Sequence, residues 1–342
     1  MRSPFLPSLL FIILFTTNLT WGQNLPPSTT LTVGVLPSYS YKADNGTTVV
    51  LGEVQNNNNF PITGVKVGFT FLNDNDNTIE YKTGTTLLHV VPAGGKAPFS
   101  ISSSTADPSI TQVSVKMAGF ISSSTRDQVL DISPGLLQVS DKLIFSGTIK
   151  NNGALKSTNT KSYLISYDAF QRVVGIGTSD SIDVNSGQNV NFTMTATSNS
   201  RAKSYLIIAE SDTYQSKLIN IPNVQVTLPV VTTSTLVTDP QGNKYQDIPI
   251  GAAVKITSDL KYIVSKSQQP FVYYVQVKQF DGQVAFIGKY EGVFLGAGDQ
   301  TVSVTWTPDT SGSYYIETYV WNSDTVPISS AGTRINVVLV NS

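Results

Sequence analysis

The sequence of 342 residues lacks cysteine and has one histidine, His89. Without cysteine, the chain forms no disulfide bond and offers no thiol for nucleophilic catalysis or lipid attachment. One histidine excludes a metal centre built from several histidines of one chain. A serine triad would need His89 as its base, yet no GxSxG sequence accompanies it, and we interpret His89 as a residue of an apolar strand. We therefore expect no enzyme, no cofactor and no metal.

Paired carboxylates are the catalytic class that the composition leaves open, since glycoside hydrolysis needs only Asp or Glu. The acids stand mostly among turn residues, where their side chains bond to nearby backbone. They include Asp168, Asp180, Asp183, Asp281 and Asp309. A secreted hydrolase stays an alternative to a protein without catalytic activity.

Charge is scarce as well, at 13% of residues compared with a usual fraction of about 25%. The 22 basic and 23 acidic side chains nearly cancel, so the composition implies no basic surface for nucleic acid. Serine, threonine, asparagine and glutamine fill the solvent-facing positions instead. This composition suits an outer surface that stays soluble without strong charge.

Long apolar runs are absent after the first residues. Arg2 precedes seven apolar residues, Leu9 to Phe15, and a polar stretch follows up to Gln23. This pattern is typical of a signal peptide, here residues 1–22. Because a helix needs about 20 apolar residues to cross a bilayer, the short run disfavours the alternative of a membrane anchor. We expect an extracellular or cell-surface location with no transmembrane anchor after cleavage, and the missing disulfides favour a prokaryotic envelope.

Apolar residues that do occur alternate with polar ones over short segments. The clearest series run from Val65 to Phe71, from Val113 to Met117 and from Phe271 to Val277. Turn clusters separate them, and no segment carries an apolar stripe with the 3.6-residue period of a helix. The sequence therefore predicts an all-β protein of antiparallel sandwiches.

An internal repeat divides the chain. GEVQNN at residues 52–57 matches GTIKNN at 147–152, an offset of 95 positions, and at an offset of 93 Phe99 falls on Phe192. Later strands extend the pattern to a third copy, in which SYYIETY at 313–319 resembles SYLIIAE at 204–210. Dividing residues 23–342 among three copies gives each copy the size of an immunoglobulin-like sandwich, about 100 residues.

Proline-containing breaks set the expected boundaries between the modules. SPG around Pro134 and IPN around Pro222 interrupt strand patterns. We expect a first sandwich over residues 23–134, a second over 135–223 and a third over 224–342, each separate from the others.

These residues resemble a known family. The first two copies are similar to the FxLYD-type domain of archaeal and bacterial exported proteins. The similarity lies in the order of G-x-[IV]-x-N-N, a loop and then a strand that ends in an aromatic-Asp turn. Phe69 to Asn73 and Leu164 to Asp168 occupy the naming motif in the first two copies. The third copy, with Val304 to Trp321, resembles adhesion-related immunoglobulin-like domains of prokaryotic surface proteins. The resemblance implies tandem sandwiches and brings no catalytic residues.

A cluster of Asn and Asp, residues 73–77, offers oxygen atoms of the kind that bind calcium. As a calcium loop that starts at Asp74, it has Ile79 at the sixth position and Thr85 at the twelfth, where glycine and glutamate are needed. Asn and Asp also tolerate left-handed backbone angles and bond to their own backbone. We therefore interpret the cluster as a hairpin turn, with a calcium site as the alternative.

Two N-glycosylation sequons occur, at Asn45 and Asn191. Asn45 stands in a predicted turn. Asn191 precedes Phe192 on a predicted strand, so it points outward beside an inward ring. Both are candidate glycan acceptors.

Strand alternation near the C-terminus predicts a candidate binding surface. Even-numbered residues of Tyr314 to Trp321 would face the core, while the odd-numbered ones and the outward residues of Tyr273 to Phe280 would share the opposite face. The candidates are Tyr274, Lys278, Tyr315, Glu317, Tyr319 and Trp321. Rings are enriched where proteins bind partners. Packing against another module and plain cross-strand stabilisation are the alternatives.

Together these patterns predict an exported, non-enzymatic surface or envelope protein of three tandem immunoglobulin-like antiparallel β-sandwiches that contacts proteins or glycans. The alternatives are an accessory carbohydrate-binding protein or secreted hydrolase, and an assembly factor that lends a strand edge to a client. A deep cleft with converging acids would favour a hydrolase. A long uncharged free edge would favour the assembly factor. The sequence leaves the oligomeric state open.

We expect the chelator EDTA to leave the melting temperature unchanged, because no module needs calcium for its fold. Thermal unfolding followed by circular dichroism, with and without EDTA, measures this. A drop beyond experimental scatter would mean that residues 73–77 hold a metal.

Overall fold

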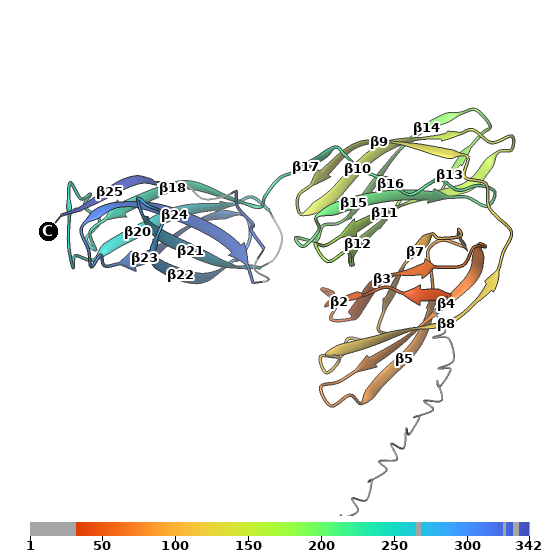
Figure 1. Cartoon of the computed structure of the whole chain (residues 1–342), viewed down its shortest axis with the longest axis horizontal. Helices are drawn as coiled ribbons and strands as arrows, with labels where there is room; N and C mark the ends of the chain where they lie inside the picture. The colour runs from red at the N-terminus through yellow and green to blue at the C-terminus, as the bar shows by residue number, and fades with distance from the viewer. Residues whose placement is uncertain (1–31, 265–267, 324–325, 331–334, 342) are drawn as a thin grey trace, which may run out of the picture.

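The computed structural model describes residues 32–264, 268–323, 326–330 and 335–341. All the regular elements in these ranges are β-strands, which confirms the all-β prediction, and no helix there is long and apolar enough to span a membrane. The strands form three β-sandwich modules in chain order, from orange to blue in Figure 1. The predicted signal peptide, residues 1–22, lies outside the described residues.

The first module has two antiparallel sheets. In one, β3 pairs with β7 on one edge and with β1 and β2 on the other. In the second, β4 pairs with β8 on one edge and with β5 and β6 on the other. The strands are β1 (Val33–Val35), β2 (Tyr39–Lys42), β3 (Thr48–Asn56), β4 (Ile62–Leu72), β5 (Thr78–Thr85), β6 (Val90–Val91), β7 (Lys96–Ser102) and β8 (Gln112–Ser122).

The second module repeats this plan with one addition. One sheet has the order β14-β10-β9-β17, in which β17 lies parallel to β9. In the other, β11 pairs with β15 on one edge and with β12 and β13 on the other, and β16 follows β15. The strands are β9 (Leu130–Val139), β10 (Lys142–Asn151), β11 (Ser157–Tyr167), β12 (Val173–Thr178), β13 (Ile182–Val184), β14 (Asn189–Thr197), β15 (Ser204–Glu210), β16 (Ile219–Asn220) and β17 (Val224–Val226).

The third module pairs a three-stranded sheet, order β18-β20-β23, with a five-stranded one, order β19-β25-β24-β21-β22. Its core contains Phe271, Tyr273 and Tyr314. The strands are β18 (Val230–Thr238), β19 (Ile248–Pro249), β20 (Val254–Tyr262), β21 (Gln269–Gln279), β22 (Val284–Phe294), β23 (Gly298–Trp306), β24 (Gly312–Asn322) and β25 (Ile335–Asn341).

The glycine of the sequence repeat has the same surroundings in the first two modules. Gly52 of β3 lies opposite Phe99 of β7, and Gly147 of β10 lies opposite Phe192 of β14. A β-carbon built on Gly52 would lie 2.4 Å from Phe99 Cζ, far inside the contact distance of two carbon atoms. The glycine therefore leaves room for a ring from the neighbouring strand.

The first asparagine of each repeated NN pair is buried and holds the loop that follows it. Asn56 Nδ2 donates a hydrogen bond to the carbonyl oxygen of Phe60 at 2.9 Å, and Asn151 Nδ2 donates to that of Leu155 at 2.8 Å. In both cases the side-chain oxygen accepts the backbone N–H two residues later. The two side chains form hydrogen bonds with backbone groups of the loops, which have no partner in a neighbouring strand. The repeated asparagine therefore fixes the conformation of the loop that follows it.

The hairpin turns between the central strands also repeat at the offset of 95. The Asn73 side chain accepts the backbone N–H groups of residues 75 and 77, and Asp168 accepts those of residues 170 and 172. Asp76 and Gln171 take left-handed backbone angles, with φ of 59° and 60°. Residues 73–77 therefore form the predicted hairpin turn.

Both prolines expected at module boundaries lie within the second module. Pro134 belongs to β9 and pairs opposite Gly147 at a shift of register, because a bulge accommodates a residue without an N–H group. Pro222 precedes β17, which extends the sheet of the second module to Val226. By strand pairing, the second module begins near Val129 and ends near Thr227.

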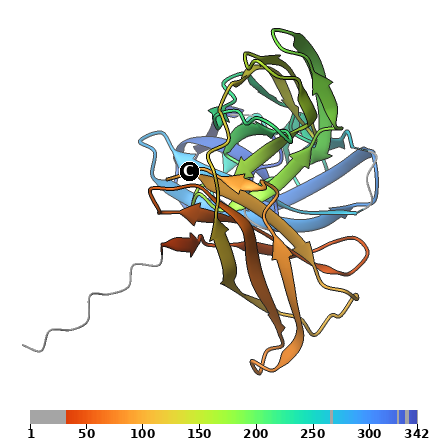
Figure 2. The same ribbon diagram turned by 90° about the vertical axis from the view of Figure 1, so that its right-hand side faces the viewer.

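The first two modules pack against each other, whereas the sequence analysis predicted sandwiches that are separate from one another. Residues 48–54 of β3 are all buried, so both faces of this strand are covered. The apolar cluster of the first module continues into Tyr163, Ile165, Tyr167, Val173 and Ile208 of the second. Adjacent residues Val49, Val50 and Leu51 are apolar on both faces of β3, and the outer face requires a cover. The four sheets of the two modules stack in layers, with the first module (orange) below the second (green) in Figures 1 and 2.

Glu210 of β15 ties the two modules together through hydrogen bonds. Its buried carboxylate accepts the backbone N–H groups of His89 at 2.7 Å and Val90 at 3.0 Å, both from the first module. Arg126, between the modules, places Nη1 2.8 Å from Oε1, and Gln215 Nε2 donates to the same oxygen at 2.7 Å. A buried charge with this many partners is costly to disrupt.

Glu53 of β3 is a second carboxylate at this interface, with a relative exposure of 1%. The Tyr167 hydroxyl of the second module donates to Oε1, and Lys96 Nζ of the first module lies 3.6 Å from Oε2. Burial raises the pKa of Glu53, while Tyr167 and Lys96 act against that rise. The contact fixes how the two stacked sheets lie on each other.

We expect Asn151→Ala to lower the free energy of unfolding by roughly 1–3 kcal/mol, because buried carbonyl groups lose their donor. Urea denaturation of the full chain measures the loss. Asn152→Ala is the matched control, since Asn152 is exposed. Equal effects of the two substitutions would contradict the anchoring role.

Candidate functional site

The six residues predicted as a binding surface lie on one face of the five-stranded sheet of the third module. Along β24 every second residue is buried, and Tyr315, Glu317, Tyr319 and Trp321 are the partly exposed ones. Along β21, residues 274 and 278 share this intermediate exposure. Cross-strand pairing places Tyr274 opposite Tyr319 and Lys278 opposite Tyr315. The predicted side-chain orientation is confirmed, and we call this surface the aromatic face.

The rings of the aromatic face contact one another in two groups. Trp321 lies with its ring centroid 5.1 Å from that of Tyr274 and 6.4 Å from that of Tyr319, in edge-to-face geometry. At the other end, Tyr315 stacks on Phe280 with centroids 5.7 Å apart, and Phe280 is 69% exposed. Such ring pairs add favourable energy to the sheet and leave apolar area in contact with water.

An ion pair lies on the aromatic face beside the first ring group. Glu317 Oε2 lies 2.7 Å from Lys278 Nζ and accepts a hydrogen bond from the Tyr319 hydroxyl at 2.8 Å. Burial raises the pKa of Tyr319, and the bond to Glu317 adds to the rise. These contacts hold three long side chains in fixed positions.

Sequence reasoning missed the contribution of β22 to this face. Ile287 lies opposite Gln276, Lys289 opposite Tyr274, and Glu291 opposite Val272. Lys289 and Glu291 form an ion pair at 2.6 Å, and the Lys289 ammonium lowers the pKa of Glu291. The turn at Asp281-Gly282 followed by an alternating segment was the available signal, since it places the next strand beside β21.

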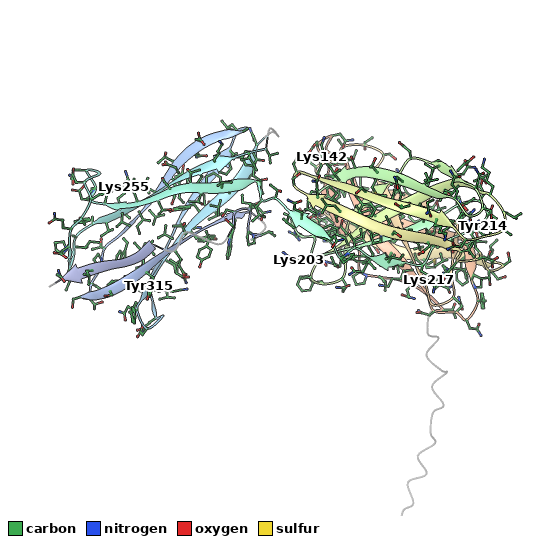
Figure 3. All side chains as sticks on the ribbon, turned by 90° about the horizontal axis from the view of Figure 1, so that it is seen from above. Lys142, Lys203, Tyr214, Lys217, Lys255 and Tyr315 are labelled. Atoms are coloured by element: carbon green, nitrogen blue, oxygen red, sulfur yellow. The ribbon has the colours of Figure 1, made fainter. Side chains whose placement is uncertain are left out.

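The outer face of the opposite sheet has a different chemistry. Asp259 of β20 accepts hydrogen bonds from Ser234 at 2.6 Å and Thr301 at 2.7 Å, and these bonds lower its pKa. Lys255 lies on the same strand, and Figure 3 labels it on a different sheet from Tyr315. Rings therefore gather on one face of the third module and not on both.

His89 lies in a bend before β6, and not inside a strand as predicted. Its side chain is 78% exposed, with Nδ1 4.0 Å from Glu210 Oε2. The backbone of His89, which Glu210 binds, is the part that contributes to the fold. Among the described residues, no group of three or more His, Cys, Asp or Glu side chains could hold a metal ion.

A cleft of about 790 Å³ lies where the second and third modules meet. Tyr205, Lys203 and Tyr262 contribute to its wall, and Figure 3 labels Lys203 at this end of the second module. Among the described residues that line the cleft, Asp141 is the one with a carboxylate. Asn322 Nδ2 donates to Ser200 Oγ at 3.0 Å and joins the modules beside it. None of the six predicted residues lines the cleft.

Both sequon asparagines are exposed. Asn45 lies in the turn before β3, where its Oδ1 accepts hydrogen bonds from the backbone and hydroxyl of Thr47. Asn191 points outward from β14 beside the buried Phe192, as predicted, and accepts a bond from Thr148. Their glycosylation stays a prediction.

No family model matches the sequence, and no curated protein sequence matches it at a significant level. Solved structures with similarity include a transglutaminase of red sea bream, at 12% identity and a TM-score of 0.36, over 64% of this chain and 32% of that one. The C-terminal domain of Wzt matches at 8% identity and a TM-score of 0.30, over 34% of this chain and 75% of that domain.

The α2-macroglobulin of E. coli also matches, at 10% identity and a TM-score of 0.23. The match covers 90% of this chain and 20% of the macroglobulin. The chain thus spans about a third of the transglutaminase and a fifth of the macroglobulin. Each of these likenesses concerns β-sandwich architecture.

We expect Tyr314→Ala to destabilise the third module more than Trp321→Ala. Tyr314 is 1% exposed and packs on Trp306, so its loss should cost about 3–5 kcal/mol, as for other buried rings. Trp321 is partly exposed and should cost less. Hydrogen-exchange mass spectrometry of peptides from β21 and β24 in the full chain measures local stability. Equal losses would contradict the assignment of Trp321 to the surface.

Proposed function

We propose that the chain is an exported, non-enzymatic surface or envelope protein that binds a protein or glycan partner on the aromatic face of its third module. The observation that carries the proposal is the one-sided placement of the rings. Tyr274, Tyr315, Tyr319 and Trp321 share a face with an ordered Lys278–Glu317 pair, while the opposite sheet presents hydroxyl and charged groups. A ring network needed only for stability has no reason to favour one outer face.

Preorganisation supports a role in binding. Glu317 is held by Lys278 and Tyr319, and each ring of the face packs on another. A partner that docks here immobilises few additional rotamers, so less of the contact energy is lost to ordering. Tyr and Trp are also enriched among the residues that contribute most to binding at protein interfaces.

The angles between the rings indicate the shape of the partner. Trp321 meets Tyr274 at 60° and Tyr319 at 62°. These rings form a stepped surface and not a single plane. A contoured protein segment or a bent glycan chain can contact both ring faces and ring edges, which a flat polysaccharide sheet cannot.

The export part of the proposal rests on the sequence. Residues 1–22 have the pattern of a signal peptide, and the low charge and absent cysteine suit an envelope protein. The FxLYD-type resemblance of the first two modules points to the same class of exported proteins. The four-layer stack of these modules then serves as a rigid base that carries the third.

The test measures retention of native envelope fractions by the immobilised mature chain. The bound partner is identified, and its dissociation constant is compared among wild type, Tyr319→Ala, Trp321→Ala and Phe170→Ala. We expect each aromatic-face variant to lose roughly 1–3 kcal/mol of affinity, as interface anchors do. Phe170 is the matched control, an exposed ring on the second module. Equal binding by all four proteins, or no retained partner, would refute the proposal.

A further inference from the structure

Strand β22 forms a free edge of the five-stranded sheet of the third module. It pairs with β21 along one side, and within the described residues no strand pairs with its other side. Its register with β21 is regular from Phe286 to Phe294, and the single shift lies beyond that segment. The segment contains no proline, and Ile287, Tyr290 and Val293 are exposed. An open edge of this kind invites a further strand.

The sequence of this edge is symmetric in its chemistry. Residues 286–294 read FIGKYEGVF. Counted outward from Tyr290, the residues on the two sides are Lys and Glu, then Gly and Gly, then Ile and Val, then Phe and Phe. The two charges are opposite in sign, and every other pair matches in size and polarity.

Antiparallel pairing of two identical strands brings position i of one strand opposite a position j of the other, with a constant sum of i and j. With Tyr290 at the centre, Lys289 lies opposite Glu291 of the second strand, and Glu291 opposite Lys289. Ile287 then lies opposite Val293. Cross-strand pairs of opposite charge and pairs of aliphatic side chains are both favourable.

We propose that a second copy of this chain pairs with β22 in antiparallel register about Tyr290, which makes a homodimer with a continuous sheet across the two third modules. The chemistry of the edge selects this occupant over an unrelated strand. Charges on an edge normally repel added strands. Here Lys289 and Glu291 are placed so that a copy of the same strand, in this one register, presents the opposite charge to each.

The register also decides which faces come together. Lys289 and Glu291 lie on the side of the sheet that carries Tyr274 and Val272. The two-fold axis of this pairing runs perpendicular to the sheet, so the same face of both copies points the same way. The dimer presents two aromatic faces side by side, while the pairing itself does not depend on what those faces bind.

Charge reversal tests the pairing in the full mature chain. Sedimentation equilibrium over a wide concentration range should show reversible dimers of the wild type. Lys289→Glu and Glu291→Lys should each weaken dimerisation roughly tenfold, because like charges then meet at both symmetry-related pairs. Lys255→Glu, on the opposite sheet, is the charge-matched control and should leave dimerisation unchanged.

Mixing the two single variants is the decisive step. Each has lost its own Lys289–Glu291 ion pair, so a recovery of dimers on mixing can only arise between chains. We expect the equimolar mixture to form heterodimers with near wild-type affinity. A wild type that stays monomeric at all concentrations, charge reversals no stronger than the control, or a mixture without recovery would each overturn the proposal.

Discussion

Burial of both faces of β3 is the constraint on which the arrangement of the first two modules depends. An ordinary sandwich strand turns one face to its core and the other to water. In β3 the outer face is apolar as well, and it carries Glu53, whose Oε1 accepts a hydrogen bond from Tyr167 across the interface. The second module covers this face. Its Glu210 also accepts hydrogen bonds from the backbone N–H groups of residues 89 and 90 of the first module. The two modules therefore share one apolar cluster and buried polar contacts across their interface.

The direction in which side chains point along each strand and the internal repeat both follow directly from local sequence pattern. Alternation with period two is a property of neighbouring residues, so it placed Tyr315, Tyr319 and Trp321 on one face without knowledge of the fold. The matches of Gly52 with Gly147 and of Asn56 with Asn151 depend on identical local geometry, which strand pairing reproduces. Such features are predictable because each is settled within one hairpin.

Features that depend on contacts between distant segments were not predictable in this way. Pro134 has the same local signature at a bulge as at a module boundary, and only its pairing with Gly147 distinguishes the two. Glu53 looks like a surface residue of an alternating strand until Tyr167, more than a hundred residues later, is placed beside it. The part of the aromatic face on β22 was missed for a similar reason, because assigning strands by parity does not say which strand lies at the edge.

The parallel pairing of β17 with β9 determines how the second module responds to mechanical force. These strands are the last and the first of the module, and they run in the same direction, joined by hydrogen bonds from Leu137 to Asn223 and from Thr227 to Val139. A pull that enters through the first module and leaves through the third slides the two strands past each other. Their hydrogen bonds are then loaded together and not one after another. A protein anchored at one end and holding a partner at the other would transmit tension through a strand pair that is loaded in shear.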